Sequence, residues 1–203
     1  MFELYPGKSP IQCYYLGMQA AGFVLVGGRS TRMGRDKALL RCNSSSLLEE
    51  VASKVAAAAG SVALIGEPER YAWLGWDCLP DLRPGLGPLA GIEAALESRR
   101  GEVNLIVACD MPGLETPWLL RLLAKTEETN APCVVARDAD RQFHPLLGVY
   151  KTVCLPAVRN ALDHKRLKVS DLVRGLQAVT LDIGQTIRNV NTPEDWAAWR
   201  ESA

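Results

Sequence analysis

The sequence of 203 residues lacks several features that define whole classes of protein. It has only two histidines, and none of its six cysteines forms a Cys-x-x-Cys pair, so the usual spacing of a zinc site is missing. No apolar run reaches the roughly 18 residues that span a bilayer. Lys and Arg number 23 and Asp and Glu also number 23, a balance that argues against a general nucleic-acid binder. We therefore expect neither a membrane nor a nucleic acid as a partner.

The composition that is present is that of one globular domain. Hydrophobic residues make up 48% and charged residues 23% of the chain, which excludes global disorder. The first residues lack the charged and apolar segments of a secretory signal, so we expect a cytoplasmic protein with reduced cysteines. Residues 1–18 show no periodicity and are interpreted as an N-terminal extension, with a single domain over residues 19–203.

Short apolar runs alternate with longer amphipathic stretches from residue 20 onward. Helical spacing, preceded by the capping pair Ser46 and Glu49, marks one such stretch over residues 47–59. The expected strands are 21–26, 61–65, 76–79, 103–109, 132–136, 146–150 and 178–183, and the further helices are 89–96, 117–125 (after a Thr116 cap), 152–162, 169–173 and 193–199. This alternation predicts an α/β fold, a three-layer sandwich with a mostly parallel central sheet. Ligands of such sheets bind beyond the carboxyl ends of the strands.

A glycine-rich loop, residues 27–37, directly follows the first expected strand. It lacks the Gly-Lys-Ser/Thr ending of a Walker A loop and contains no Gly-x-Gly-x-x-Gly fingerprint. Its adjacent glycines, Gly27 and Gly28, nevertheless allow backbone N–H groups to approach an anion. Between residues 29 and 41 there are five cations and one anion in an otherwise neutral chain. The loop therefore suits a polyphosphate, and the alternative is a solvated basic loop.

The segment Leu25–Lys37 reads Leu-Val-Gly-Gly-Arg-Ser-Thr-Arg-Met-Gly-Arg-Asp-Lys. It resembles the opening signature of the molybdenum cofactor guanylyltransferase family, which belongs to the nucleotidyltransferases with a Rossmann-like, glycosyltransferase-A-like fold. The sequence departs from that signature at Val26, where the family usually has Ala. The resemblance implies that the backbone of this loop, with Arg32 and Lys37, binds the triphosphate of a nucleotide.

Two further loops carry the resemblance onward. The first, residues 80–92, is similar to the family's element that ends in Gly-Pro-Leu-x-Gly-Ile, and Asp81 lies at its start. Asp81 could accept hydrogen bonds from a purine edge or a ribose hydroxyl, or could simply form a turn. The second contains Cys109-Asp110-Met111-Pro112, in which Asp110 ends the most apolar strand. A carboxylate at this edge beside a phosphate is the usual setting for Mg²⁺, and the matching residue of the family binds the metal.

The later matches concern the second substrate, the acceptor. Lys165 and Arg166 are similar to a basic segment that the family places near the phosphate of the acceptor, although a solvated face would look the same. Asn189 and Asn191 match the family's ending and could bind the pterin or help to hold the metal, while the residues after them form an ordinary helix start. His144 resembles part of the family's His-Pro strand, and a structural role suits it as well as one in orienting the substrate.

Together these matches, in order from Leu25 to about Trp196, imply one reaction. The terminal phosphate of molybdenum-carrying molybdopterin would attack the α-phosphate of GTP, so that pyrophosphate leaves and a guanine dinucleotide cofactor forms. The resemblance assigns Lys37, Arg32 and Asp110 to catalysis, Asp110 to Mg²⁺, and Leu25, Val26, Gly27, Gly28, Lys37, Asp81 and Asp110 to the nucleotide. Lys165, Arg166, Asn189 and Asn191 are assigned to the acceptor.

Other readings of the same residues stay open. A cytidylyltransferase acting on the same pterin, or a sugar-phosphate nucleotidyltransferase, would share the glycine-rich loop, although Val26-Gly27-Gly28 and the stretch over residues 87–91 favour guanine. A non-catalytic nucleotide-binding accessory protein would keep the fold, but the presence of both Lys37 and Asp110 speaks against it. The expected protein partners are the apo-enzymes that receive the cofactor and other proteins of cofactor synthesis.

Overall fold

The computed structural model describes residues 20–27, 36–42 and 45–202. Seven strands within these residues form one sheet, in the order β5–β4–β1–β6–β8–β7–β9. The strands are β1 (Ala20–Leu25), β4 (Ala63–Ile65), β5 (Cys78–Leu79), β6 (Val103–Ala108), β7 (Cys133–Arg137), β8 (Phe143–Lys151) and β9 (Val179–Asp182). The strand β8 is antiparallel to both β6 and β7, whereas the other neighbouring pairs are parallel. The prediction of a mostly parallel sheet is confirmed.

The two central strands, β1 and β6, owe their place to continuous apolar runs. All six residues of β6 are buried, as parallel strands covered on both faces require. Asn104 is the polar exception in β6, and its side-chain nitrogen donates to the Tyr150 carbonyl at 3.1 Å. The register pairs Leu25 with Ala108, so both strands end at the same level of the sheet. The residues that follow them, Val26-Gly27 and Cys109-Asp110, therefore emerge side by side.

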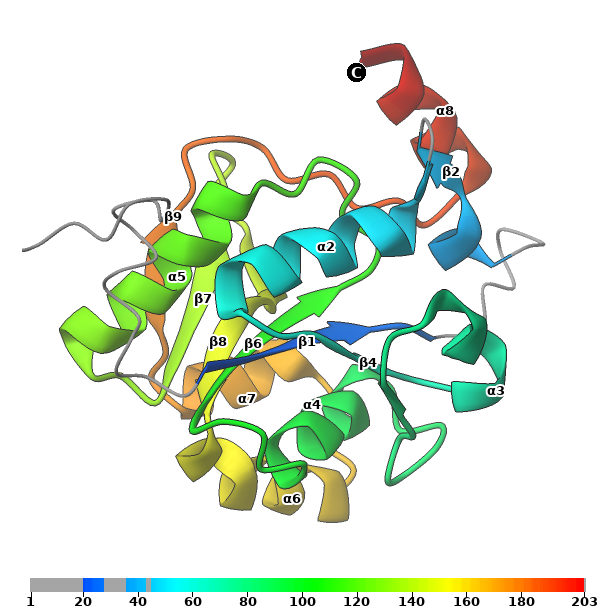
Figure 1. Ribbon diagram of the computed structural model, residues 1–203. Helices are drawn as coiled ribbons and strands as arrows, with labels where there is room; N and C mark the ends of the chain where they lie inside the picture. The colour runs from blue at the N-terminus through cyan, green and yellow to red at the C-terminus, as the bar shows by residue number, and fades with distance from the viewer. Residues whose placement is uncertain (1–19, 28–35, 43–44, 203) are drawn as a thin grey trace, which may run out of the picture.

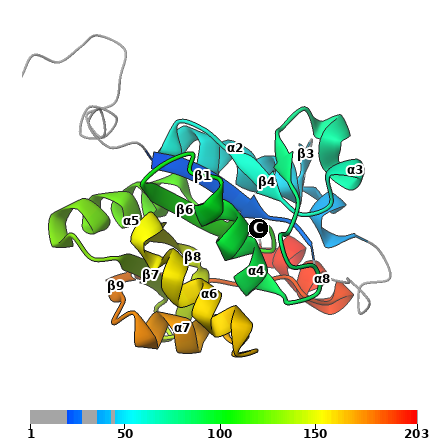
Figure 2. The same cartoon turned by 90° about the horizontal axis from the view of Figure 1, so that it is seen from below.

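Helices cover both faces of the sheet and complete the three layers (Figures 1 and 2). The helices α2 and α5 cover one face, and α4, α6 and α7 cover the other. The helical segments are η1 (Lys37–Leu39), α2 (Leu47–Ala59), α3 (Pro68–Tyr71), η2 (Ala72–Leu74), α4 (Pro88–Glu97), α5 (Thr116–Thr129), η3 (Thr152–Cys154), α6 (Leu155–Asp163), α7 (Val169–Gly175) and α8 (Pro193–Ser202). Of the helices described, none has the length and apolar character needed to cross a membrane.

The sequence predicted some helix starts correctly and others incorrectly. The predicted capping box of α2 is confirmed, because Glu49 N donates to the Ser46 hydroxyl at 3.2 Å and Ser46 N donates to the Glu49 carboxylate at 2.7 Å. The Thr116 cap is wrong, since Thr116 is the first helical residue and the capping position is Glu115, which forms no side-chain cap. The helix expected from residue 152 begins as the tighter turn η3.

Several short elements had no expectation from the sequence. The helix α3 and the turns η1 and η2 have three or four residues each, too few to show a periodicity. The two-stranded ribbon formed by β2 (Arg41–Cys42) and β3 (Ser45–Ser46), which leads from η1 into α2, was not expected either.

Candidate active site

Three parallel strands deliver their loops to one point on the carboxyl edge of the sheet. Cys109 N donates to the Leu25 carbonyl at 3.2 Å, which extends the pairing of β1 and β6 past their ends. Val26 N donates to the Ile65 carbonyl at 2.9 Å and does the same for β1 and β4. These bonds fix the start of the glycine-rich loop between the loops that follow β4 and β6, where an α/β sheet of this kind binds its ligands.

Lys37 and Asp110 meet at this edge although they are 73 residues apart in the chain. The Lys37 Nζ lies 2.9 Å from Asp110 Oδ2, and the two side chains are 17% and 14% exposed. Because little water surrounds the pair, its charges are only weakly screened. Both predicted catalytic groups of the described chain thus share one location.

The turn η1 aims Lys37 at this location, and Asp36 holds the turn. The Asp36 Oδ1 atom accepts from Ala38 N at 3.1 Å and so caps η1. The Asp36 Oδ2 atom accepts from the Tyr71 hydroxyl at 2.9 Å and lies 3.1 Å from the Arg70 guanidinium. Burial, and then the hydrogen bond to Asp36, raises the pKa of Tyr71, so the hydroxyl keeps its proton. The family motif supplied Asp36 in the sequence, but its partners in α3 could not be read there.

The segment before α8 also reaches this place, and it comes from β9, the strand at the end of the sheet order. Val190 N donates to the Asp110 carbonyl at 2.8 Å, and Lys37 Nζ donates to Asn191 Oδ1 at 3.3 Å. Asp195 fixes the backbone here, because its carboxylate accepts from Asn191 N at 2.9 Å and from Thr192 N at 2.8 Å. Backbone hydrogen bonds from Asn191 and Thr192 lower the pKa of Asp195. Of the four residues predicted for the acceptor, Asn191 is the one that touches Lys37.

One oxygen of Asp110 is left over by this network. Its Oδ1 atom is buried and has no hydrogen-bond partner among the described residues, a costly state for a carboxylate oxygen. Mg²⁺ is often held by one or two carboxylates, with waters and substrate phosphates completing its shell. The described residues hold no group of three His, Cys, Asp or Glu that could bind a metal by themselves. Asp110 therefore fits an ion shared with a phosphate ligand.

The loop after β5 lies two strands from β1 on the same edge. Asp81, at the start of this loop, is partly buried, and burial, followed by the charge of Glu67, raises the pKa of its carboxyl. The loop ends at Gly87, which precedes α4 with a positive φ of 73°, and no side chain caps the helix start. Glycine tolerates this conformation, and Ala90 N in the first turn of α4 donates to the Gly87 carbonyl at 3.0 Å.

Leu25 and Val26 contribute their backbone to the carboxyl edge of the sheet, whereas their side chains pack into the core. Val26 is 2% exposed and packs into the core on the α2 face. Its larger size relative to Ala is accommodated by Gly66, where an added Cβ would lie 2.1 Å from the Val26 carbonyl oxygen and 2.8 Å from Val26 Cγ2. Gly91 of α4 likewise leaves room for the Leu25 side chain. The Val26 side chain, which replaces the Ala usual in the family signature, thus lies in the core and not at the site.

Of the remaining predicted residues, some are exposed and away from Lys37, and others lie outside the described residues. Lys165 and Arg166 are exposed after α6, and Arg166 hydrogen-bonds the Asn160 side chain. The end of α6 lies beside the loop after β5, because Asp163 and Arg83 are paired at 2.5 Å, so the basic run is not in the contact network of Lys37. Asn189 is exposed two residues before Asn191. Gly28 and Arg32, like the extension over residues 1–18, lie outside the described residues.

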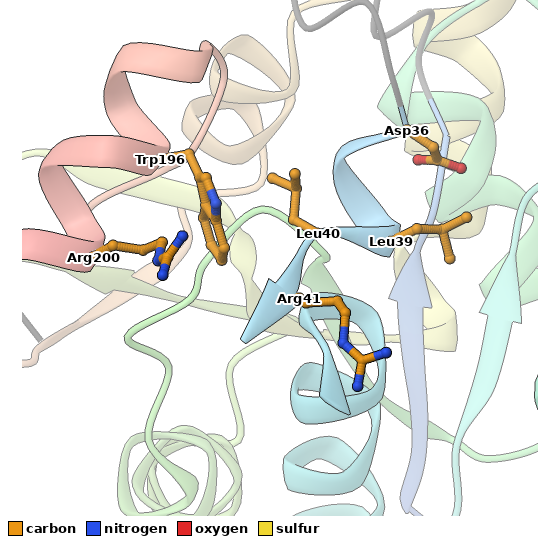
Figure 3. A pocket seen from close by; sticks show the side chains of 6 residues that line it. All are labelled: Asp36, Leu39, Leu40, Arg41, Trp196 and Arg200. Carbon is orange, nitrogen blue, oxygen red and sulfur yellow. The ribbon is translucent and has the colours of Figure 1, made fainter. Parts of the chain in front are cut away.

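A cavity of about 420 Å³ opens between η1, β2 and α8, next to Asp36 (Figure 3). Its lining consists of Asp36, Leu39, Leu40, Arg41, Trp196 and Arg200. Trp196 is also a packing residue, because it is mostly buried and stacks on Trp199 with 5.1 Å between ring centroids. Sequence reasoning missed Arg200, which has no motif around it and reaches the cavity only through the position of α8.

Comparison with known proteins gives a consistent family. The family model described as "MobA-like NTP transferase domain" matches residues 22–179. A probable molybdenum cofactor guanylyltransferase of Pelotomaculum thermopropionicum is 36% identical over 88% of this chain and 90% of its own length. A molybdenum cofactor guanylyltransferase of Mesorhizobium japonicum is 34% identical over 87% of this chain and 92% of its own length.

Solved structures with lower identity share the fold. The molybdopterin-guanine dinucleotide biosynthesis protein A of Archaeoglobus fulgidus has a TM-score of 0.75 at 22% identity and covers 90% of this chain and 97% of its own. The Rv0371c protein of Mycobacterium tuberculosis, solved in complex with manganese, has a TM-score of 0.66 at 18% identity, covering 91% of this chain and 98% of its own. The predicted three-layer nucleotidyltransferase fold is confirmed.

Proposed function

The chain belongs to the MobA-like NTP transferase family, among the molybdenum cofactor guanylyltransferases, and from this premise we propose that it transfers GMP from GTP to molybdopterin. The terminal phosphate of the pterin, which already carries molybdenum, attacks the α-phosphate of GTP, and pyrophosphate leaves. The observation that carries the proposal is the meeting of Lys37 and Asp110 at 2.9 Å on the carboxyl edge, with Asn191 beside them and one Asp110 oxygen left unpartnered.

Lys37 acts on the triphosphate of GTP. Its amine has a single side-chain carboxylate partner within the described residues, and phosphate oxygens can replace part of that contact. Placed beside the departing pyrophosphate, the amine offsets the negative charge that builds there. The backbone from Gly27 onward, with Gly28 and Arg32, is proposed to cradle the rest of the triphosphate.

Asp110 is the residue proposed to hold Mg²⁺. The ion would supply charge neutralisation on the phosphates and polarisation of the α-phosphorus. The fixed position of Asp110, tied through its backbone to Val190 and through its side chain to Lys37, presents the free Oδ1 atom at a defined place. No acid–base side chain is needed, because the attacking phosphate is already an anion, and alignment of the two substrates provides most of the remaining catalysis.

The nucleotide base is assigned to the edge between β1 and β5. Asp81 and the backbone of Leu25, Val26 and Gly27 are proposed to bind guanine and ribose. The raised pKa of Asp81 reflects a partly desolvated carboxyl, which gains from accepting hydrogen bonds of the guanine N1–H and 2-amino groups.

The acceptor is assigned to the other side of Lys37. Asn191 touches the amine, and Asn189 precedes it on the same segment. Lys165 and Arg166 follow α6 beside the loop after β5, so in their proposed role they would meet the acceptor phosphate from the nucleotide side of the site. Apo-enzymes that receive the product, other proteins of cofactor synthesis and a cytoplasmic location stay predictions of the sequence.

Pyrophosphate release with each of four nucleotides tests the proposal. The full chain is mixed with molybdenum-loaded molybdopterin and Mg²⁺, and GTP, CTP, ATP or UTP is added in separate reactions. We expect rapid release with GTP only, and no release when the pterin is left out. Preference for CTP would overturn the base assignment, and absence of release with every nucleotide would overturn the transferase assignment.

A further inference from the structure

The segment between β9 and α8 crosses the carboxyl edge of the sheet from its outer strands to its centre (Figure 1). We call residues 183–191 the edge strap. Ile183 N donates to the Arg137 carbonyl at 2.9 Å, and Ala139 N donates to the Gln185 carbonyl at 3.1 Å, so the strap starts against β7. At its other end Val190 N donates to the Asp110 carbonyl, and Asn191 meets Lys37.

A buried carboxylate, that of Asp138, holds the turn to which the strap is bonded. Asp138 is 5% exposed and directly follows β7. Its Oδ1 atom accepts from Gln142 N at 2.9 Å, and its Oδ2 atom lies 2.9 Å from His144 Nε2. The two residues that follow Asp138 bond the strap, because Ala139 N donates to the Gln185 carbonyl and the Thr186 hydroxyl donates to Asp140 Oδ2, each at 3.1 Å. Asp138 therefore joins the end of β7 to the start of β8 at the turn to which the edge strap is bonded.

His144 supplies the side-chain partner of this anchor. Its imidazole is 10% exposed and lies opposite Ala136, where the pairing of β7 and β8 shifts register between Val135 and Ala136. Such irregularities re-aim side chains at sheet edges. Burial raises the pKa of Asp138, but the hydrogen bonds from His144 and from the backbone lower it by more, so the carboxylate is ionised. An ionised carboxylate makes stronger hydrogen bonds than a neutral group.

We propose that Asp138 and His144 are positioning residues for the acceptor side of the site. They hold the turn after β7 that bonds the edge strap at Gln185 and Thr186, so that Asn191 stands beside Lys37 when the acceptor binds. Neither residue touches the reacting atoms. The acceptor part of this inference rests on the proposed function, whereas the anchoring of the strap does not.

A purely structural ion pair would behave differently from a positioning pair. Loss of a structural pair lowers the unfolding temperature and affects both substrates alike. Loss of a positioning pair frees the strap and acts on the acceptor, because the GTP side of the site is built on β1, β5 and η1. A displacement of about 1 Å at the reacting groups costs up to roughly 10²-fold in rate.

The experiment compares His144→Ala with His144→Gln and Asp138→Asn in the full chain. The Gln amide can still donate to Asp138, so His144→Gln serves as the rescue variant. Asp182→Asn is the control, because Asp182 pairs with Arg137 next to the strap but is itself largely exposed. For each variant we measure amide hydrogen exchange of residues 183–191, the unfolding temperature, the Kd of Mg-GTP, and kcat and KM for molybdopterin.

We expect His144→Ala and Asp138→Asn to speed exchange in the strap and to raise KM for the acceptor on the order of 10-fold, with lower kcat. The Kd of Mg-GTP changes less than about twofold, since the GTP side keeps its own contacts. His144→Gln recovers part of both effects, and Asp182→Asn shows neither. Combined with Asn191→Ala, His144→Ala adds less than its separate effect, because both act through the strap.

Two results would overturn the inference. Unchanged exchange of residues 183–191 in a folded His144→Ala variant would show that the pair does not anchor the strap. Faster exchange with unaltered acceptor KM and kcat would show that the strap does not position the acceptor. A wild-type chain that releases no pyrophosphate would instead overturn the proposed function and the acceptor role with it, while the exchange data would still decide the anchoring.

Discussion

The amine of Lys37 has two oxygen partners that come from distant parts of the chain, Asp110 Oδ2 at 2.9 Å and Asn191 Oδ1 at 3.3 Å. At the scale of single residues, a cation, an acid and an amide thus converge on the edge where sheets of this kind bind their ligands. The acid is only half satisfied, because Asp110 Oδ1 is buried without a partner. The arrangement is therefore able to accept both a phosphate and a metal ion.

Lys37→Ala should lower turnover by about 10²- to 10³-fold, as loss of a group that acts mainly on transition-state charge does. The fold should survive, because Lys37 is not part of the hydrophobic core and its amine contacts Asp110 and Asn191 at the edge of the sheet. Pyrophosphate release and thermal unfolding check the two halves of this expectation. Lys54→Ala is the matched control, since the ion pair of Lys54 among the described residues is a long i,i+4 contact of 4.0 Å with Glu50. Near-normal turnover without Lys37 would refute its role.

Asp110→Ala should lower turnover on the same scale, about 10²- to 10³-fold. It should also raise the Mg²⁺ or Mn²⁺ concentration needed for half-maximal rate, because the free Oδ1 atom is the proposed ligand. Rates measured over a metal titration check this point. Asp77→Asn serves as the control, because Asp77 forms an exposed pair with Arg100. An unchanged metal requirement would remove Asp110 from the metal site.

At the scale of elements, predictions succeeded where the signal is local. The capping box of α2 lies within four residues, so Ser46 and Glu49 reveal it directly. Apolar runs placed β1 and β6, and with them the loops that bear Lys37 and Asp110. The start of β8 at Phe143 was missed, because that part of the strand pairs with β7 and carries no apolar run. The role of Asp138 was missed because only the pairing of β7 with β8 brings Gln142 N and the His144 imidazole to its carboxylate.

The start of α8 has its own capping box, which holds Asn191 in place. Asp195 N donates to the Thr192 hydroxyl at 3.1 Å, and the Asp195 carboxylate accepts from Thr192 N. Thr192→Ala should cost about 1 kcal/mol of local stability, because a helix-capping hydroxyl is lost. Faster amide exchange at residues 191–196 is the measurement. Ser98→Ala, at the carboxyl end of α4, is the control, since the hydroxyl of Ser98 donates to the Ala95 carbonyl and caps no helix start.

The same box predicts a dependence on pH. Backbone hydrogen bonds lower the pKa of Asp195 below its ordinary value of 3.8 in the folded chain. Its stabilising contribution is therefore complete above that ordinary value and is lost as the pH falls through the lower, folded value. Exchange at residues 191–196, corrected for the intrinsic rate, should rise only in this acidic range. An Asp195→Asn variant that keeps the wild-type pH profile would contradict the assignment.

At the scale of the whole molecule, an ion network ties the loop after β5 to α4 and α6. Glu93 of α4 is 2% exposed, and Arg83 Nε lies 3.0 Å from its Oε2 atom. Arg83 also pairs with Asp163 at the end of α6, and Arg159 of α6 lies 3.4 Å from Glu93. The loop after β5, α4 and α6 thus share one buried acid. The sequence identified the loop by its glycines and Pro88, but it could not show that Arg83 fastens the loop to two helices.

Arg83→Ala should destabilise the fold, because it leaves a buried carboxylate with Arg159 as its remaining cation. We expect a loss of about 1–3 kcal/mol, less than for a fully unpaired buried charge. For a chain of this size each kcal/mol lowers the unfolding temperature by about 2–4 °C, so calorimetry resolves the effect. Arg174→Ala, which breaks an exposed i,i+3 pair with Asp171, should change the temperature little. In the double variant Arg83→Ala/Glu93→Gln the loss should shrink, since the unpaired charge is gone. A loss as large in the double variant as in Arg83→Ala would show that Glu93 is not the source of the cost.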